Sequence, residues 1–163
     1  MNKFMEVAID LSDDNFSKNY GGPFGACVVK DGKIIGKGIN RVIKDNDPTA
    51  HAEVIAIRNA CKLLKTHDLT GCELYTSCYP CPMCLSAIIW SNIKKVYYAN
   101  EKEDASNIGF RDDYIYDYIE KLSKDIQDKK VLSLKSMNRE DAIKVFERYQ
   151  EDENKIMYWG NYG

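Results

Sequence analysis

Two short motifs constrain most strongly what this chain can fold into, His51-Ala52-Glu53 and Pro80-Cys81-Pro82-Met83-Cys84. One imidazole and two thiols are ligands that zinc prefers, and three of them leave the fourth corner of a tetrahedron open. Pro82 suits the first position of a helix. Because Cys81 and Cys84 are then spaced i, i+3, both sulfurs face the same way at the start of that helix. The motifs predict one zinc ion per chain, bound by His51, Cys81 and Cys84.

The open corner predicts a catalytic site. Water bound to zinc becomes a nucleophile near neutral pH, and a carboxylate beside it can move the protons. Glu53 follows His51 by two positions, so it can lie beside that water without binding the metal. By itself, an acidic residue in the first turn of a helix more often only stabilises the helix dipole. The combination with Pro-Cys-x-x-Cys is instead the signature of the zinc nucleobase deaminases.

A structural zinc site is the competing interpretation. Such a site would require a fourth protein ligand in place of the open corner. Cys78 and His67 are the candidates for a fourth ligand. The other cysteines, Cys27, Cys61 and Cys72, lie inside apolar runs, where a free thiol behaves as a small core residue.

Composition limits the classes of function. The 163 residues are 44% hydrophobic and 29% charged, which predicts a single globular domain over 1–163. The formal net charge is −2 with no stripe of Lys and Arg, so a nucleic-acid partner is disfavoured. We expect no signal peptide and no membrane span, and a reducing, cytoplasmic location.

Hydrophobic periodicity predicts helices alternating with strands. An Asp-Gly pair at 31–32 between apolar runs indicates a hairpin. The expected helices are 4–11, 50–64, 82–90, 114–122 and 142–149, and the expected strands 26–29, 34–40, 74–76, 96–99 and 131–134. This order describes a sheet with helices on both faces and the site at the ends of its strands.

Several blocks resemble the bacterial guanine deaminases of the cytidine deaminase-like zinc family. The blocks are Gly21 to Ala26, Asn46 to Glu53, Tyr75 to Cys78 with Pro80 to Cys84, and Asp104-Ala105, Gly109-Phe110, Asp112 and Tyr114-Ile115-Tyr116. The resemblance runs to about Ile119, and the last block is the one that indicates guanine. It implies a three-layer α/β/α sandwich with a five-stranded mixed sheet, one catalytic zinc per chain, and conversion of guanine to xanthine and ammonia. It also implies a homodimer in which the segment from about residue 120 crosses to the partner.

The resemblance also assigns substrate-binding and catalytic roles. Asn40 resembles the amide that binds the purine, Phe24 and Trp90 the aromatic wall, and Ala52 a further contact. Asp112 resembles the second catalytic acid, which contacts the leaving amine. Two other acidic residues of this stretch, Asp113 and Asp104, remain alternatives to Asp112. A terminal aromatic closes the site in this family, and Tyr158 and Trp159 are the candidates here.

Three other functions compete with guanine deamination. A deaminase acting on adenosine in the tRNA anticodon shares the zinc and glutamate motifs but needs a basic face for phosphates. A cytosine or other small-ring deaminase is the second. A zinc-binding structural or interaction module is the third, and it would release no ammonia from any base.

Overall fold

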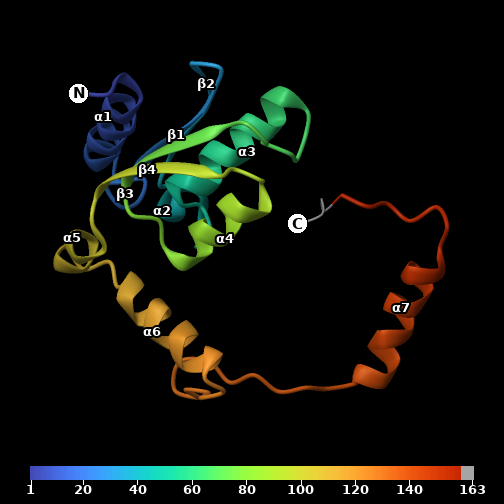
Figure 1. Cartoon of the computed structure of the whole chain (residues 1–163). Helices are drawn as coiled ribbons and strands as arrows, with labels where there is room; N and C mark the ends of the chain where they lie inside the picture. Colours follow the sequence, from blue (N-terminus) through green and yellow to red (C-terminus); the bar gives the residue numbers. More distant parts are fainter. Residues whose placement is uncertain (159–163) are drawn as a thin grey trace. The chain divides into compact units, whose positions relative to one another are not determined.

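The computed structural model describes residues 1–158, and the chain divides into two compact units, Met1–Glu120 and Lys121–Gly163 (Figure 1). The elements of the first unit include α1 (Lys3–Lys18), β1 (Gly25–Lys30), β2 (Lys33–Ile39), α2 (Val42–Asp45), α3 (Ala52–Leu64), β3 (Glu73–Cys78), α4 (Pro82–Trp90), β4 (Lys95–Asn100) and α5 (Lys102–Asn107). Helix α6 (Asp112–Ser123) follows them, and α7 (Arg139–Glu151) belongs to the second unit.

The sheet has four strands in the order β2-β1-β3-β4. Strands β1 and β2 form the predicted antiparallel hairpin, β1 also pairs antiparallel with β3, and β3 pairs parallel with β4. The connection from β3 to β4 runs through α4, as a parallel pair requires. The predicted α/β architecture is therefore confirmed, with a mixed sheet.

The fifth strand was wrong. Residues 131–134 form no strand and lie in the second unit, in a turn followed by irregular chain. A run of four residues is too short to specify a strand unless another strand lies beside it. The carbonyl of Leu134 instead accepts a hydrogen bond from Gln127 Nε2 at 3.1 Å.

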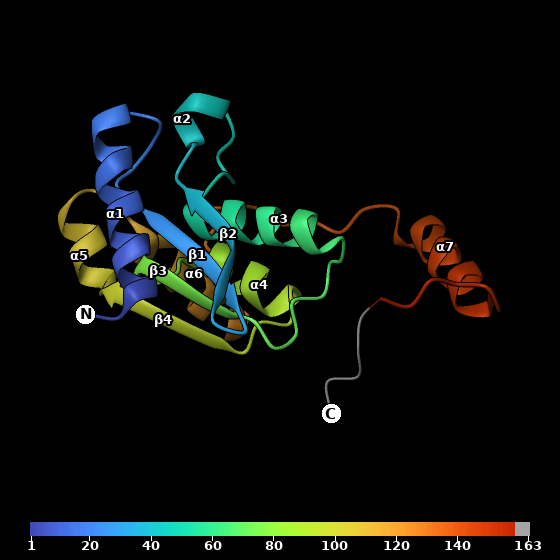
Figure 2. The same ribbon diagram turned by 90° about the horizontal axis from the view of Figure 1, so that it is seen from above.

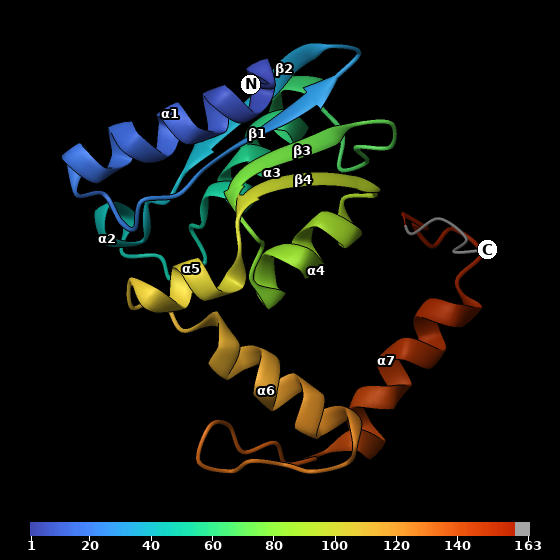
Figure 3. The ribbon, with the colours of Figure 1, turned by 60° about the vertical axis from the view of Figure 1, so that its left-hand side comes forward.

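Helices cover both faces of the sheet, with α1 on one face and α3 and α4 on the other (Figures 2 and 3). Alternate residues of β1 reach the two faces. Ala26 and Val28 belong to the core under α3 and α4, whereas Cys27 and Val29 belong to the core under α1. This alternation is the period of a strand that is buried on both sides.

Helix α3 lies unusually close to β2, because Gly38 has no side chain. A Cβ atom at Gly38 would lie 2.0 Å from the carbonyl oxygen of Ala52 and 2.5 Å from the nitrogen of Ala56. Ala52, Ala56 and Ala60 present only methyl groups and are fully buried. The small residues let the start of α3 approach the end of β2, where the site forms.

The remaining predicted elements need two additions. Helices α6 and α7 are confirmed, but the polar stretch after β4 contains the short helix α5, and α2 precedes the turn at Asn46. A capping box explains why α5 forms. The side chain of Glu101 accepts the backbone N–H of Asp104, and the side chain of Asp104 accepts the backbone N–H of Glu101. Among residues 1–158, no helix is both long and apolar enough to cross a membrane.

Candidate active site

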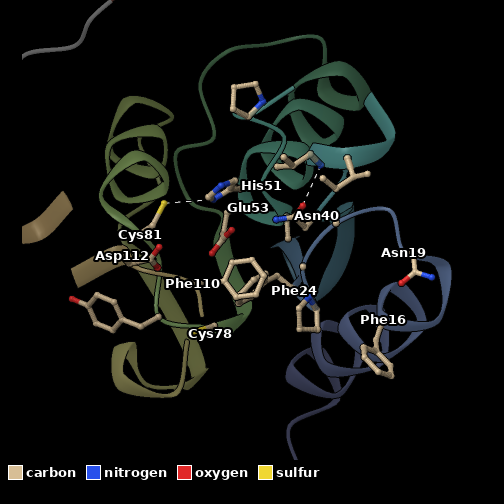
Figure 4. Close-up of a pocket in the computed structure, with 18 residues that line it drawn as sticks. Phe16, Asn19, Phe24, Asn40, His51, Glu53, Cys78, Cys81, Phe110 and Asp112 are labelled. Carbon is tan, nitrogen blue, oxygen red and sulfur yellow. Dashed lines mark hydrogen bonds between the residues drawn. The ribbon is translucent and has the colours of Figure 1, made fainter. Parts of the chain in front are cut away.

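His51 and Cys81 point toward each other at the cavity (Figure 4), and Cys84 completes the cluster with them. The Nδ1 atom of His51 lies 3.5 Å from the Sγ of Cys81 and 3.6 Å from the Sγ of Cys84. Tetrahedral zinc, with bonds of roughly 2.0–2.1 Å to nitrogen and about 2.3 Å to sulfur, separates its nitrogen and sulfur ligands by roughly 3.5–3.6 Å. The three residues therefore fit zinc, with His51 facing the metal through Nδ1.

Two helix N-termini hold these ligands. His51 is the N-cap of α3, and Cys81 is the N-cap of α4 with Pro82 following it. The Cys81 sulfur also accepts the backbone N–H of Cys84 at 3.5 Å. Because the positive end of a helix dipole stabilises negative charge, the start of α4 favours thiolates.

The two thiols of the cluster have pKa values that are shifted in opposite directions. Hydrogen bonds with Cys84 and His51 lower the pKa of Cys81 to about 4, against the opposing effect of burial. The hydrogen bond with Cys81 and burial raise the pKa of Cys84. The hydrogen bond with Cys81 also raises the pKa of His51. Metal binding to cysteine releases thiol protons, because thiolate is the form that binds.

Glu53 lies beside the ligands in a buried position. Its side chain is 6% exposed, and burial raises its pKa above the ordinary value for glutamate. Thr76 Oγ1 donates to one carboxylate oxygen at 3.0 Å, and the sulfur of Cys84 lies within hydrogen-bond distance of the other, at 3.4 Å. A carboxyl group with a raised pKa can both accept and return a proton near neutral pH.

The structure separates Asp112 from its two alternatives. Asp112, at the start of α6, lines the same cavity as His51, and burial raises its pKa, with the negative charge of Cys81 adding to the effect. Asp113 instead accepts two hydrogen bonds from Arg111, at 3.0 and 3.1 Å, outside that cavity lining. Asp104 caps α5 by accepting from Glu101 N at 2.8 Å. Of the three, Asp112 has the environment of a reacting acid.

The ligands open into a cavity of about 580 Å³, a usual size for a small-molecule site. Asn40, Phe24 and Ala52 line it, as predicted. Asn40 is 4% exposed, and its Oδ1 accepts the N–H of Val42 at 3.1 Å. Its Nδ2 is turned to the cavity (Figure 4), so Asn40 presents a hydrogen-bond donor to a ligand.

Phe110 also lines the cavity, and it was not among the predicted site residues. Its ring meets that of Phe24 edge to face, with the ring centroids 4.9 Å apart. The sequence signal was its place two residues before Asp112, but a single aromatic in a polar stretch has no periodicity that would show where it points.

Trp90 is the predicted wall residue that the structure does not bring to this cavity. It is the last residue of α4, 61% exposed, and absent from the cavity lining. Because a helix rises about 1.5 Å per residue, the nine-residue α4 separates its two ends by more than 10 Å. Phe110 packs beside Phe24 in this cavity instead.

Neither candidate for a fourth metal ligand joins the cluster. Within residues 1–158, the cluster able to hold a metal consists of His51, Cys81 and Cys84. The Cys78 thiol points to the carbonyl of Glu101 at 3.6 Å, and burial raises its pKa to about 11. His67 is exposed in the turn after α3. Three protein ligands are the arrangement of catalytic zinc.

Fold and site together define the cytidine deaminase-like class of zinc proteins. Residues 1–100 match the cytidine and deoxycytidylate deaminase zinc-binding region, and the chain belongs to this family. The resemblance seen in the sequence is thereby confirmed.

Two groups of relatives are similar to the chain. Guanine deaminase from Bacillus subtilis is 54% identical over 118 residues, which cover 72% of this chain and 76% of the relative. Its crystal structure matches 98% of this chain and 100% of its own with a TM-score of 0.88, at 43% identity. A tRNA-specific adenosine deaminase from Aquifex aeolicus is 46% identical over 96 residues, 59% of this chain and 63% of the relative.

Proposed function

We propose that the chain hydrolyses guanine to xanthine and ammonia, with one zinc ion per chain. The observation that carries this proposal is the position of Asp112. This carboxyl group comes from α6, beyond the residues 1–100 shared by the wider family, and it lines the same cavity as His51 and Glu53. The identity to a guanine deaminase, 54%, also exceeds the 46% identity to a tRNA-specific adenosine deaminase.

His51, Cys81 and Cys84 would hold the zinc, which supplies a water molecule that is acidic enough to act as a nucleophile near neutral pH. Glu53 is the proton carrier: it takes a proton from that water and gives it to a ring nitrogen of the base. Burial suits Glu53 to this task, because its raised pKa brings the two protonation states closer in energy near neutral pH.

Asp112 serves the leaving group. The exocyclic amine must gain a proton to depart as ammonia, and Glu53 is occupied with the water and the ring nitrogen. The raised pKa of Asp112 lets it hold a proton at the amine nitrogen. Water thus supplies the oxygen of xanthine, and its two protons balance those gained by the ring and the amine.

The base lies between an aromatic contact and an amide. Phe24 and Phe110 offer apolar surface to the purine ring, and Ala52 is the small residue beside them. The Nδ2 of Asn40 donates to an acceptor on the purine edge, because its oxygen is already bonded to Val42.

Adenosine in tRNA is the second candidate substrate, since tRNA-specific adenosine deaminases share the zinc region. The net charge of −2 disfavours it, because binding to the phosphates of RNA requires clustered basic residues. Ammonia release from guanine, compared with adenine, cytosine, cytidine and a tRNA anticodon stem-loop, decides between them. Release from the stem-loop but not from guanine would overturn the proposal.

We further infer a homodimer in which the segment from about residue 120 completes the partner's site. Exposed apolar side chains support an interface: Val145 and Phe146 on α7 are 52% and 72% exposed, and Trp90 is 61% exposed. Tyr158 is a candidate for closing the site, and Trp159 lies outside the described residues. The single-domain organisation and the cytoplasmic location stay predictions.

A further inference from the structure

Asn15 is a buried polar residue outside the cavity. Its side chain is 0% exposed, and it and Ala8 are the two buried residues of α1. It does not line the cavity that holds His51. A buried amide needs hydrogen-bond partners, so the question is which groups Asn15 serves.

The Asn15 amide joins the two segments that carry the proposed purine-binding residues. Its Nδ2 donates to the carbonyl of Gly22 at 2.8 Å and to the carbonyl of Asn40 at 2.9 Å. Gly22 O also accepts the N–H of Phe24 at 2.8 Å, and Phe24 O accepts the N–H of Asn40 at 3.2 Å. The Asn15 side chain thus fixes the backbone at Asn40 and at Gly22, two residues before Phe24.

The segments that Asn15 joins are packed without spare room. A Cβ atom at Gly21 would lie 2.0 Å from Oδ1 of Asn40, so the loop backbone rests directly on the Asn40 amide. A small shift of this loop would therefore move or rotate the amide that faces the base.

The donor side of the Asn15 amide makes its two contacts. Its Nδ2 bonds to Gly22 O and Asn40 O, whereas its Oδ1 is buried and has no hydrogen-bond partner among the described residues. An apolar side chain of similar volume would leave both carbonyls without this donor, so the amide is what keeps the two segments joined.

We propose that Asn15 is a positioning residue that holds Phe24 and Asn40 in register for binding the purine base. The inference rests on the proposed function for the identity of the base. Asn15 itself touches no substrate. The residues proposed to react, Glu53 and Asp112, come from α3 and α6, so loss of Asn15 should weaken binding more than chemistry.

The test is Asn15→Asp, which keeps the shape but turns an acceptor toward two carbonyl oxygens. We expect KM for guanine and the inhibition constant of xanthine to rise at least tenfold, with kcat within threefold of wild type and zinc content unchanged. Asn59→Asp is the matched control, because Asn59 Nδ2 also donates to a β2 carbonyl, that of Lys37 at 2.8 Å, on the exposed side of α3. Its KM should stay at the wild-type value.

Asn15→Leu is the second variant, since it removes the donor without adding charge and also removes the unpartnered oxygen. It should raise KM to a similar extent. An unchanged KM in a folded variant, an equal fall in kcat with KM constant, or failure of both variants to fold would overturn the inference, because Asn15 would then serve stability alone. Wild type tests the proposed function separately: if it deaminates another base instead, the same comparison is made with that base.

Discussion

At the scale of single residues, burial shifts the pKa values of the groups that are proposed to do the chemistry. The pKa of Glu53 is raised by its burial between Thr76 and Cys84, whereas that of exposed Asp113 is lowered by Arg111. Two acidic side chains of the same chain thus acquire different chemistry from their surroundings. Three predictions belong to this scale.

Glu53→Gln should abolish most turnover. Glutamine preserves the shape and still bonds to Thr76, so zinc content and xanthine binding should stay near wild type. Turnover of guanine should fall by about 10² to 10⁴, the usual loss when a general acid–base group is removed. Steady-state kinetics with metal analysis measures both. Glu73→Gln is the control, since Glu73 is also on the sheet but bonds to Tyr75 away from the cavity; near-normal turnover in Glu53→Gln would place the proton carrier elsewhere.

Asp112→Ala should lower kcat for guanine by about 10²-fold or more while metal content and the midpoint of thermal unfolding stay close to wild type. The neighbouring variant Asp113→Ala is the matched control, because Asp113 is engaged by Arg111 at the surface. It should change kcat less than about threefold, since an exposed ion pair contributes little. If the two variants exchange these effects, Asp113 is the acid at the amine.

Cys27→Ala should reduce the loss of unfolding free energy that occurs as the pH rises above 9. Burial raises the pKa of Cys27 from 9.0 to about 11. The folded state therefore keeps a proton that the unfolded chain releases, and this contribution to the free energy of unfolding is lost as the pH rises from 9 to 11. At pH 10.5 the loss is about 2 kcal/mol.

Urea unfolding at pH 8 and pH 10.5 measures the effect of Cys27. Other groups, Cys78 included, titrate in both proteins, so the difference between wild type and Cys27→Ala isolates one thiol. Equal slopes of stability against pH in the two proteins would show that Cys27 is not protected in the folded state.

At the scale of elements, the site exists because two helices begin at the same edge of one sheet. The start of α3 supplies His51 and Glu53, and the start of α4 supplies both thiols. Helix α6 is tied to the same place by Tyr116, whose hydroxyl donates to the carbonyl of Pro80 at 2.7 Å. The close packing of α3 on β2 determines where the first of these helices begins.

Gly38→Ala should therefore harm both stability and activity. The added methyl group would meet the backbone of Ala52 and Ala56, which cannot rotate away as a side chain can. Overpacking of this kind costs about 1–3 kcal/mol, and the shift of α3 would move His51 and Glu53 away from the thiols. Chemical denaturation and zinc titration measure the two effects. Lys37→Ala, at the exposed neighbouring position of β2, is the control and should leave both quantities close to wild type. A Gly38→Ala protein with wild-type zinc affinity would mean that the helix moves without disturbing the site.

At the scale of the whole molecule, the first unit holds every residue proposed to bind metal or to transfer protons. The second unit, from Lys121 onward, has a helix with no buried residue, α7, and exposed apolar side chains along it. An amphipathic helix without a buried face favours contact with a partner chain.

Truncation before Asn154 tests the role of the tail. We expect the shortened chain to keep its zinc and its fold, because residues 1–120 contain the sheet and the ligands. Activity on guanine should fall at least tenfold if the tail closes the partner's site and excludes water. Light scattering and kinetics of the truncated chain give the assembly and the rate; full activity would exclude closure by the tail.

The cluster of His51, Cys81 and Cys84 could be predicted from the sequence because its chemistry is local. Ligand type, i, i+3 spacing and the helix start at Pro82 are all properties of a few adjacent residues. The hairpin and the helices 50–64 and 82–90 were predictable for the same reason, since their periodicity lies within one segment. By contrast, the short strand at 131–134 was wrong, because a strand needs a partner edge that no local pattern specifies.

Tertiary structure alone decided which of several similar residues share the cavity. Asp112 and Asp113 are adjacent and chemically equal in the sequence, and only the bond to Arg111 and the burial at the cavity tell them apart. The contact of Phe110 with Phe24 and the bond of Asn15 to Asn40 likewise join residues far apart in the chain. Sequence by itself determines the chemistry that a residue offers, whereas long-range packing determines which residues are near enough to use it together.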